Sequence, residues 1–598
     1  MKLSKLYSNY PDKFGPINFN KGLNVIIGEI KEENRDKDTH NLGKSTFMKV
    51  IDFCLLSKKE KDFFLFKHYD IFKDFIFFIE IELIDGTYVT VRRSVADASK
   101  ISLKKHTERH QDFLLSTDKD WDHHNIKLER SKHILEGLLN LQVLKSFKYR
   151  NALAYFLRPQ NDYNNVFKSG KYSISKDVDW KPLMANILGF NSDSISEQYK
   201  KEDERKGKQD KKKKLENKVG DYLNKIENLE KDIKDKDDNI KKIDDQINRF
   251  DFKIQDEEKT KLLAGDIDIR MSILNNERYS LEHNKKKIAN ICAKQEISFD
   301  TKKASALFKD VGLLFEGQIK KSFDELIAFN KAITEERIVY LKKELNELES
   351  EVSEINAQIN ELTQKRSEML AFIGSDKVFD KYKQLSNELV NIKIEAALLV
   401  KRRELVVDIN KLKKYIEELT KTIEEIKKNI VIDLNNSKAD QNSAFSSINS
   451  LFAGIIKDVI GVRSWLDVSI NDAGHLEFNV NIADDNDNVT SQGDGNTYKK
   501  FQCIAFNLSV LRHYIDSKFI RFAYHDGIFE GLDDRKKQNL LGIIEKCTNS
   551  GIQLIITLID SDSPPPPEDS KQVFNDSDII LKLHDNGDEG RLFRMPEW

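Results

Sequence analysis

Gly43, Lys44, Ser45 and Thr46 end the stretch NLGKST, which has the form of the last part of a phosphate-binding loop. In the motif G-x-x-x-x-G-K-[ST], backbone N–H groups surround the β-phosphate, the lysine reaches the β and γ oxygens, and the hydroxyl binds Mg²⁺. Gly28 supplies the first glycine, although about ten more residues separate it from Gly43 than the motif contains. The added residues are polar and charged, so they can extend into solvent at a small entropic cost.

The residues on both sides of this loop predict a strand before it and a helix after it. LNVII, which precedes Gly28, has the pattern of a buried strand, and FMKVIDFCLL, which follows Ser45, has that of an amphipathic helix. A strand, a glycine loop and a helix are the context in which this motif binds phosphate. The sequence therefore favours a nucleotide site over a chance occurrence of GKST.

Three further stretches contain residues that such a site uses. FIRFAYHDGIFEGLDDR begins as an apolar strand that ends in Asp526, the expected acidic residue on the Mg²⁺ side, and Asp533 follows it. SQGDGNTYKKFQ, with Ser491 and Gly493, is a loop of small residues that opens a helix, and YFLRPQND contains Gln160. Each stretch taken alone has an ordinary structural explanation, such as an N-capped helix or a surface glutamine. Their order along the chain favours the functional interpretation.

Composition limits the class of protein. Of 598 residues, 33% are charged and only 9 are proline, which indicates long exposed helices rather than several compact cores. A net charge of −2 gives no argument for nucleic acid. The four cysteines form no C-x-x-C pair, which excludes a zinc ribbon or zinc hook and makes a disulfide framework unexpected. Because no apolar run reaches about 18 residues and the start has no apolar leader, we expect a cytoplasmic protein without a membrane span.

Heptad patterns divide the chain into three parts. Apolar residues step by three and four from Leu215 to Ile254, and again from Ile338 to Met369, with Lys236 and Arg366 in the two seams. Two such runs predict an antiparallel coiled-coil hairpin over 195–430, with its apex near 296–325. The hairpin would separate an N-terminal lobe, 1–194, from a C-terminal lobe, 431–598, and antiparallel pairing would bring the two lobes together.

Both arms of the predicted hairpin are interrupted, at LLAGD around Gly265 and at AFIGSD around Gly374. The interruptions lie at similar heights, so they could form an elbow, or each could be a local irregularity in the packing. The lysine run KQDKKKKLENK at the base of the first arm is compatible with phosphate contact and with a solvated helix face. The sequence leaves both pairs of alternatives open.

The order of these motifs resembles the SMC, RecN and related DNA-repair branch of the ABC ATPase superfamily. In that branch a phosphate-binding loop, a glutamine loop, a long hairpin, a signature loop, an acidic strand and a D-loop with the pattern D-E-x-x-x-x-L-D follow one another. More narrowly, FLRPQNDY, SFDELIAFNKAITEERIVYL, HDGIFEGLD and the long first loop resemble a bacterial family of coiled-coil ABC ATPases of unknown function. That family occurs in ABC three-component gene clusters suspected of defence against phage and mobile DNA.

The resemblance implies an α/β P-loop ABC-type ATPase head, split into N- and C-terminal lobes, with a long antiparallel coiled-coil hairpin inserted. It also implies a homodimer whose heads enclose ATP and Mg²⁺, arms directed at DNA, and additional protein subunits encoded nearby. The Mg²⁺ ligands would be Ser45, Asp526 and Gln160, and the nucleotide-binding residues of one head would be Gly28, Asn41, Gly43, Lys44, Ser45, Thr46, Asp526 and Asp533. Ser491 and Gly493 would come from the opposite head.

Two positions depart from the pattern of the superfamily. Gly527 replaces the glutamate that usually polarises the attacking water, and Leu558 replaces the switch histidine. Loss of a general base costs about 10²- to 10⁴-fold in rate, so hydrolysis would be slow unless Glu530 has taken over, with Gln160 as its catalytic partner. The alternatives are an ATP-binding scaffold that recruits an effector and, less in keeping with the motifs, a purely structural coiled-coil protein. His525 could contact nucleotide, but a packed strand-end histidine is the simpler interpretation.

Overall fold

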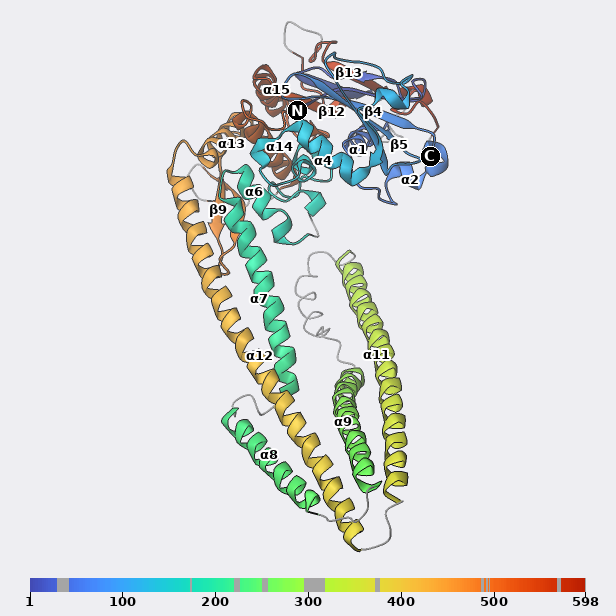
Figure 1. Cartoon of the computed structure of the whole chain (residues 1–598). Coiled ribbons are helices and arrows are strands. Elements are labelled where there is room, and N and C mark those ends of the chain that lie inside the picture. The colour runs from blue at the N-terminus through green and yellow to red at the C-terminus, as the bar shows by residue number, and fades with distance from the viewer. Residues whose placement is uncertain are drawn as a thin grey trace. The chain divides into compact units, whose positions relative to one another are not determined.

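A computed structural model describes residues 1–29, 42–172, 175–219, 226–249, 256–294, 318–371, 377–484, 489–490, 493, 495–566, 572–596 and 598. They form two compact units, which are coloured along the chain in Figure 1. Met1–Glu204 and Leu419–Trp598 make one of them, here called the head unit. Arg205–Glu418 makes the other, called the arm unit.

The centre of the head unit is a five-stranded parallel sheet to which both ends of the chain contribute. Its order is β13 (Ile579–His584), β3 (Leu23–Glu29), β12 (Gln553–Ile559), β11 (Phe522–His525) and β8 (Leu157–Arg158). The three central strands, β3, β12 and β11, are mostly buried and largely apolar, as expected of parallel strands covered on both faces. The two lobes expected from the sequence therefore share one sheet.

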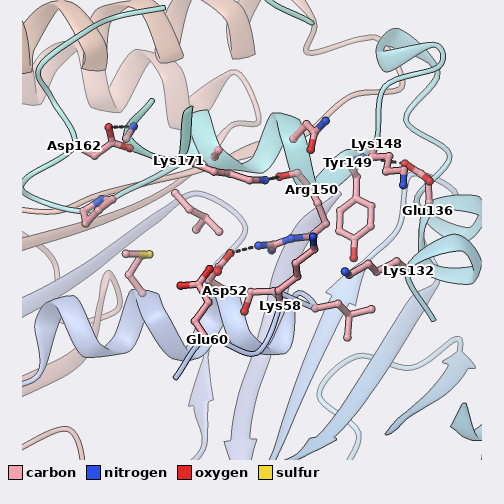
Figure 2. A pocket seen from close by; sticks show the side chains of 18 of the residues that line it. Asp52, Lys58, Glu60, Lys132, Glu136, Lys148, Tyr149, Arg150, Asp162 and Lys171 are labelled. Carbon is pink, nitrogen blue, oxygen red and sulfur yellow. Dashed lines mark hydrogen bonds and ion pairs between the residues drawn. The ribbon is translucent and has the colours of Figure 1, made fainter. Parts of the chain in front are cut away.

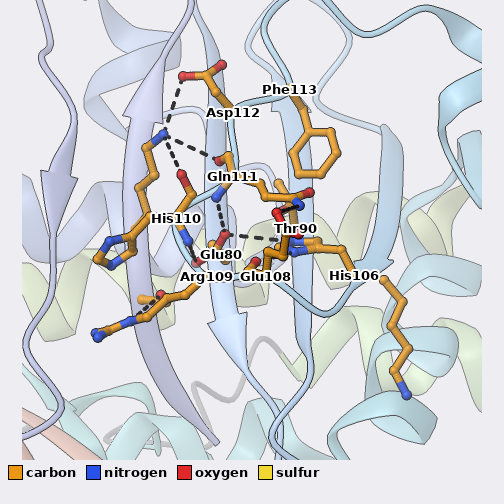
Figure 3. A network of polar contacts seen from close by, with 12 residues as sticks. Glu80, Thr90, His106, Glu108, Arg109, His110, Gln111, Asp112 and Phe113 are labelled. Carbon is orange, nitrogen blue, oxygen red and sulfur yellow. Dashed lines mark hydrogen bonds and ion pairs between the residues drawn. The ribbon is translucent and has the colours of Figure 1, made fainter.

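A six-stranded sheet from the N-terminal segment forms the second layer of the head unit. Its order is β2 (Ile17–Asn18), β1 (Lys2–Ser8), β4 (Ile76–Glu82), β5 (Tyr88–Ser94), β6 (Lys100–His106) and β7 (His123–Lys127), and neighbours are antiparallel. Figure 3 shows how the chain after β6 is held on this sheet. The buried carboxylate of Glu80 accepts the backbone N–H groups of His110 at 2.8 Å and Gln111 at 3.0 Å. Lys5 Nζ adds an ion pair with Asp112 at 3.3 Å.

Helices surround the two sheets of the head unit. The N-terminal segment supplies α1 (Lys44–Cys54), α2 (Phe64–Lys67), α3 (Tyr69–Phe72), α4 (Leu128–Leu139), α5 (Tyr149–Phe156) and α6 (Lys181–Ile187). The C-terminal segment supplies α13 (Ala444–Ile460), α14 (Asn496–His513) and α15 (Asp534–Asn549), with a hairpin of β9 (Arg463–Ile470) and β10 (Leu476–Ala483). One continuous cluster of buried apolar side chains joins both segments.

The arm unit consists of long helices paired in antiparallel fashion. The helices are α7 (Ser192–Val219), α8 (Ile226–Asn248), α9 (Asp256–Lys294), α11 (Gln318–Ala371) and α12 (Lys377–Ala439); the first and last continue into the head unit. The side chains of Arg278 and Asn356 meet, as do those of Lys285 and Glu349, so α9 and α11 run in opposite directions. None of the described helices has a stretch apolar enough to cross a membrane.

The chain reverses between α11 and α12. Arg366 near the end of α11 contacts Asn387 on α12 at 2.6 Å, although the two residues are 21 positions apart and one straight helix would separate them by roughly 31 Å. Both helices also reach Asp268 on α9, through Arg366 at 2.8 Å and Ser386 at 3.4 Å. The arm unit is therefore folded back on itself rather than built as one straight pair of arms.

The fold-back corrects part of the predicted hairpin. The predicted interruption at Gly265 does not break the helix, because Gly265 lies inside α9, which leaves a local irregularity in the packing as the alternative that fits there. Gly374 and most of the expected apex near 296–325 lie outside the described residues. The two charged seam residues both have acidic partners, Lys236 with Glu395 and Arg366 with Asp268, which explains how cations are tolerated there.

A candidate nucleotide site in the head unit

Part of the predicted site lies at the carboxyl edge of the parallel sheet, namely Gly28, Gly43, Lys44, Ser45 and Asp526. Gly28 near the end of β3 pairs with Ile559 of β12, and Asp526 directly follows β11. In parallel sheets the carboxyl ends of adjacent strands meet at one edge, where ligands bind in open α/β folds. Residues that are almost 500 positions apart in the chain thus come together here.

Gly43 occupies a position that other residues would enter only with strain. Its φ of 101° is left-handed, and a Cβ built on it would lie 2.6 Å from Leu592 Cβ. The N–H of Leu592 also donates to the carbonyl of Leu42 at 3.1 Å, so the C-terminal segment supports the loop. Helix α1 begins at Lys44 without a side-chain cap, which leaves its first N–H groups available to an anion.

Ser45 and Asp526 are in direct contact. Ser45 Oγ donates to Asp526 Oδ2 at 2.7 Å, and Thr557 Oγ1 donates to Asp526 Oδ1. Thr557 Oγ1 in turn accepts the backbone N–H of Gly527 at 3.0 Å. Hydroxyl and carboxylate oxygens are the hard ligands that Mg²⁺ takes, usually with water and phosphate oxygens in its remaining positions. The pair therefore fits a nucleotide-bound Mg²⁺.

A larger protein metal site is absent from the described residues, where no three His, Cys, Asp or Glu side chains converge. Mg²⁺ needs no such cage, because one or two carboxylates plus substrate phosphates are enough.

Lys44 faces the same space as these oxygens. Burial lowers the pKa of its ammonium group from the ordinary value, and Asp526, Asp562 and Glu530 act in the opposite direction. The Tyr524 hydroxyl donates to the Lys44 carbonyl at 2.9 Å and so ties the start of α1 to β11. A desolvated cation at a free helix N-terminus is suited to a phosphate group.

Glu530 lies beside the place that a side chain at Gly527 would occupy. A Cβ built on Gly527 would be 3.1 Å from Glu530 Oε2, 3.3 Å from Lys500 Nζ and 3.9 Å from Gln160 Nε2. Glu530 Oε2 accepts from Gln160 Nε2 and from Lys500 Nζ, both at 2.8 Å. Partial burial raises the pKa of the Glu530 carboxyl, but the hydrogen bond and ion pair with Lys500 outweigh this and hold it below the ordinary value.

His525 is packed inside the head unit. Its Nδ1 lies 3.3 Å from the Tyr163 hydroxyl, and the two rings stack at a centroid distance of 6.3 Å. Burial first, and then the nearby Arg158 and Lys500, lower the pKa of the imidazole to about 3. The neutral, buried ring fits the interpretation of His525 as a packed strand-end histidine rather than a nucleotide contact.

The remaining predicted residues occupy separate positions. Thr46 lies half-buried on α1, next to Ser45. Asp533 is the N-cap of α15, where its side chain accepts the backbone N–H of Lys536 at 3.0 Å. Gly493 packs against Ile482 and Gln502 ahead of α14. Asn41 and Ser491 lie outside the described residues.

Thr557 and Lys500 were not predicted from the sequence, but they contact the predicted residues at the sheet edge. Thr557 contacts Asp526, and Lys500 contacts Glu530. Thr557 is the one polar residue within the buried apolar run LIITLI of β12, which is a detectable signal. Because His525 pairs with Ile556, the next residues along the two parallel strands, Asp526 and Thr557, are neighbours. Lys500 gives no comparable signal, since it stands near the start of a helix with a lysine beside it.

A separate cavity of 930 Å³ lies on another side of α1 (Figure 2). None of the predicted site residues lines it. Its charged side chains largely compensate one another, as with Arg150 and Asp52 at 2.8 Å, and Lys171 Nζ donates to the Arg150 carbonyl at 2.7 Å. The cavity therefore shows no preference for a ligand of one charge, and the candidate site remains the sheet edge.

Comparison with known proteins gives one family and a set of solved structures. Residues 455–597 match a family described as an uncharacterised protein conserved in bacteria, DUF2326. No curated protein sequence matches the chain.

Three solved structures are similar to almost the whole chain. The Smc head domain with a coiled coil and joint from Pyrococcus yayanosii shares 15% identity, covers 93% of this chain and 92% of its own, and has a TM-score of 0.35. The Smc head domain with an extended coiled coil from Pyrococcus furiosus, bound to the C-terminal domain of ScpA, shares 12% identity over 94% and 92%, with a TM-score of 0.33. The SmcHead bound to the C-winged helix domain of ScpA shares 10% identity over 94% and 92%, with a TM-score of 0.36. All three are Smc heads, and the first two also contain a coiled coil.

Proposed function

We propose that the head unit binds ATP with Mg²⁺ at the sheet edge and hydrolyses it as an SMC-like ATPase. The observation that carries this proposal is the 2.7 Å contact between Ser45 Oγ and Asp526 Oδ2. The residue after the loop lysine and the acidic end of a neighbouring strand are 481 positions apart, yet their oxygens meet where a Mg²⁺ ion would sit between them.

The residues at the sheet edge have separate roles in this proposal. The N–H groups at the start of α1 and the Lys44 ammonium would bind the β- and γ-phosphates, and Gly43 would let the backbone come close. Ser45 and Asp526 would hold Mg²⁺, with Gln160 as a further ligand. Mg²⁺ supplies charge neutralisation at the phosphate oxygens when it is bound.

Glu530 is the proposed general base. A water molecule would attack the γ-phosphorus and give its proton to the Glu530 carboxylate, while the bond from that phosphorus to the bridging oxygen of ADP breaks. Its carboxylate lies near the place where a glutamate at position 527 would begin, as the 3.1 Å distance from a Cβ built there indicates. Gln160, which donates to Glu530, would orient the same water.

Two heads would enclose the nucleotide in a homodimer, with Ser491 and Gly493 from the opposite chain at the γ-phosphate. ATP binds the closed state better than the open one, so it would shift the population towards closed heads, and hydrolysis would release them. The arm unit would transmit this change to DNA, in genome maintenance or defence against phage and mobile DNA, with further protein subunits as partners. These roles depend on the family resemblance.

A second candidate is an ATP-binding scaffold that hydrolyses slowly or not at all. Gly527 and Leu558, at the positions of the usual base and switch histidine, favour it. The scaffold would use nucleotide to hold an assembly together and to recruit an effector protein. Both candidates require the same nucleotide site, and only turnover separates them.

The test measures Mg²⁺-ATP binding by calorimetry, dimer formation by light scattering, and phosphate release with and without DNA. Lys44→Ala removes the phosphate-binding ammonium, and we expect it to abolish tight binding and turnover together. Lys49→Ala, an exposed lysine on the same helix, is the matched control and should behave as the wild type. Tight binding without turnover supports the scaffold, and equal ATP affinity in wild type and Lys44→Ala overturns the nucleotide site.

A further inference from the structure

Glu530 is held by side chains from two other parts of the head unit. Lys500 on α14 and Gln160 after β8 both donate to Glu530 Oε2 at 2.8 Å. The Lys500 side chain is only 11% exposed, whereas that of Glu530 is 47% exposed. The burial of Lys500 fixes its position, so the lysine orients the glutamate rather than the reverse.

The environment of Lys500 explains how it is kept in place. Its ammonium group lies over the Tyr163 ring, 5.7 Å from the centroid, at a distance where cation–π attraction acts. Glu530 is its ion-pair partner, and Gly527 leaves room because a Cβ there would lie 3.3 Å from Lys500 Nζ. A side chain at position 527 would therefore crowd the lysine ammonium group, which glycine does not.

A second contact joins the turn that contains Glu530 to the same helix. Gly531 has a φ of 76°, and a Cβ built on it would lie 3.0 Å from Thr497 Oγ1. Thr497 and Lys500 are three residues apart on α14, so they project from the same face. The turn after β11 thus rests on the first turn of α14, immediately after the loop that contains Gly493.

The position of Glu530 in sequence makes this support necessary. A glutamate that directly follows Asp526 would project from the strand end, but Glu530 must reach back from three residues further along the turn, where its own side chain is 47% exposed. Its side chain has three rotatable bonds and would lose its orientation without a partner. A general base is effective only when it is held in hydrogen-bonding reach of the water it deprotonates.

We propose that Lys500 is a positioning residue, which holds the Glu530 carboxylate beside the empty place at Gly527 and couples that placement to the first turn of α14. The inference rests on the proposed role of Glu530 as the base. It adds a means of regulation, because a change at the loop before α14, where the opposite head would bind, would move Lys500 and with it the base.

The test compares four single variants and one double variant in steady-state ATP turnover. Lys500→Met keeps a similar length but removes the charge, and we expect kcat to fall about 10- to 100-fold through misplacement of the base, while KM and ATP affinity stay within about 2-fold. Lys500→Arg should restore most of kcat. Arg512→Met, an exposed residue in the last turn of the same helix, is the matched loss of charge and should leave kcat unchanged.

The fourth variant is Glu530→Gln, alone and combined with Lys500→Met. The inference requires that the double variant be no slower than Glu530→Gln, because Lys500 acts only through that carboxylate. It also requires that Glu530→Gln and Lys500→Met, each alone, extend the lifetime of the ATP-bound dimer as followed by light scattering. Thermal melting and ATP affinity show whether Lys500→Met is folded, and Lys500→Arg gives a second measurement if it is not.

Failure of this inference differs from failure of the proposed function. If Glu530→Gln abolishes turnover while Lys500→Met keeps kcat within about 2-fold of wild type, Lys500 has no positioning role and the proposed base stands. If Glu530→Gln turns over as the wild type does, the base is assigned wrongly and the inference falls with it. A loss of ATP affinity in Lys500→Met equal to its loss of kcat would also overturn the inference.

Discussion

Two buried carboxylates in the head unit, Glu80 and Asp526, are satisfied in different ways. Glu80, fully buried on β4, accepts backbone N–H groups from two consecutive residues of one loop. Asp526, 2% exposed, accepts side-chain hydroxyls from Ser45 on α1 and Thr557 on β12. A backbone donor cannot turn away unless its loop moves, whereas a hydroxyl can rotate and offer its oxygen to a cation.

The difference separates a carboxylate that holds structure from one that can accept a ligand. The donors of Glu80 come from a single loop, so the contact fixes that loop on the six-stranded sheet (Figure 3). The donors of Asp526 come from separate elements that meet at the open carboxyl edge of the other sheet. Parallel substitutions at the two positions should therefore affect different properties.

Asp526→Asn should have the largest effect, and it should act on turnover. The amide keeps the shape of the side chain but lacks the charge that would bind Mg²⁺, a contribution of several kcal/mol, so we expect at least about a 100-fold loss of kcat. The melting temperature should change little. Phosphate release and thermal melting measure the two effects, and Glu80→Gln is the matched control. Equal losses of turnover in both variants would contradict the comparison.

Glu80→Gln should act on stability and leave turnover intact. The glutamine cannot accept both N–H groups with charged oxygens, and hydrogen bonds to a charged group contribute about 1.5–3 kcal/mol, so we expect about 2 kcal/mol less stability. Urea unfolding, followed by far-UV circular dichroism, measures the change. An unfolding midpoint equal to that of the wild type would show that the loop is held by other contacts, such as the ion pair of Lys5 with Asp112.

The strand and the helix on either side of the candidate loop could be predicted because their signals are local. A buried strand pattern, two glycines, Lys44 and an amphipathic helix follow one another within residues 23–56. Asp526 was predicted for a similar reason, since an apolar run ends in an acid. The meeting of the two ends was also predictable, because antiparallel arms return the chain to its starting point.

Contacts that depend on strand register or on a neighbouring helix could not be predicted in the same way. Thr557 reaches Asp526 only because β12 pairs with β11 in the register His525 with Ile556. Lys500 reaches Glu530 only because α14 packs beside the turn after β11. In the arm unit the heptads predicted the helices, and the interruption AFIGSD allowed an elbow after α11. The heptads did not predict which helix packs against which, since an apolar seam has the same pattern with any partner helix.

Thr557→Val should produce a moderate effect on the Asp526 cluster. It keeps the shape of the side chain but removes the donor to Asp526 Oδ1 and the acceptor for the Gly527 N–H. Leaving a buried polar group unsatisfied costs about 1–3 kcal/mol, so we expect about a 10-fold lower kcat if the cluster is poised for catalysis. Thr557→Ser should retain most of the activity. A serine variant as slow as the valine variant would argue that the methyl group, not the hydroxyl, matters.

The smallest expected effect is on the pH dependence of stability, and it concerns His110, whose backbone N–H donates to Glu80. Burial and then Arg109 lower the pKa of His110, Lys5 acts in the same direction, and Glu80 and the backbone of Ser4 oppose them. The unfolded chain, with a histidine pKa of about 6.5, therefore takes up more protons than the folded protein as the pH falls below that value, and stability decreases.

His110→Asn should remove this part of the acid sensitivity. Asparagine is suited to the position because the φ of His110 is 64°, in the left-handed region that asparagine tolerates. Between about pH 7 and about pH 5 the melting temperature of the variant should fall by less than that of the wild type. Turnover at neutral pH should be unchanged, because His110 lies in the loop that Glu80 holds and not at the sheet edge. If the melting temperatures of the two proteins fell equally, proton uptake by other groups would dominate the acid sensitivity. Glu80 and Asp526 would then differ only in the groups that donate hydrogen bonds to them.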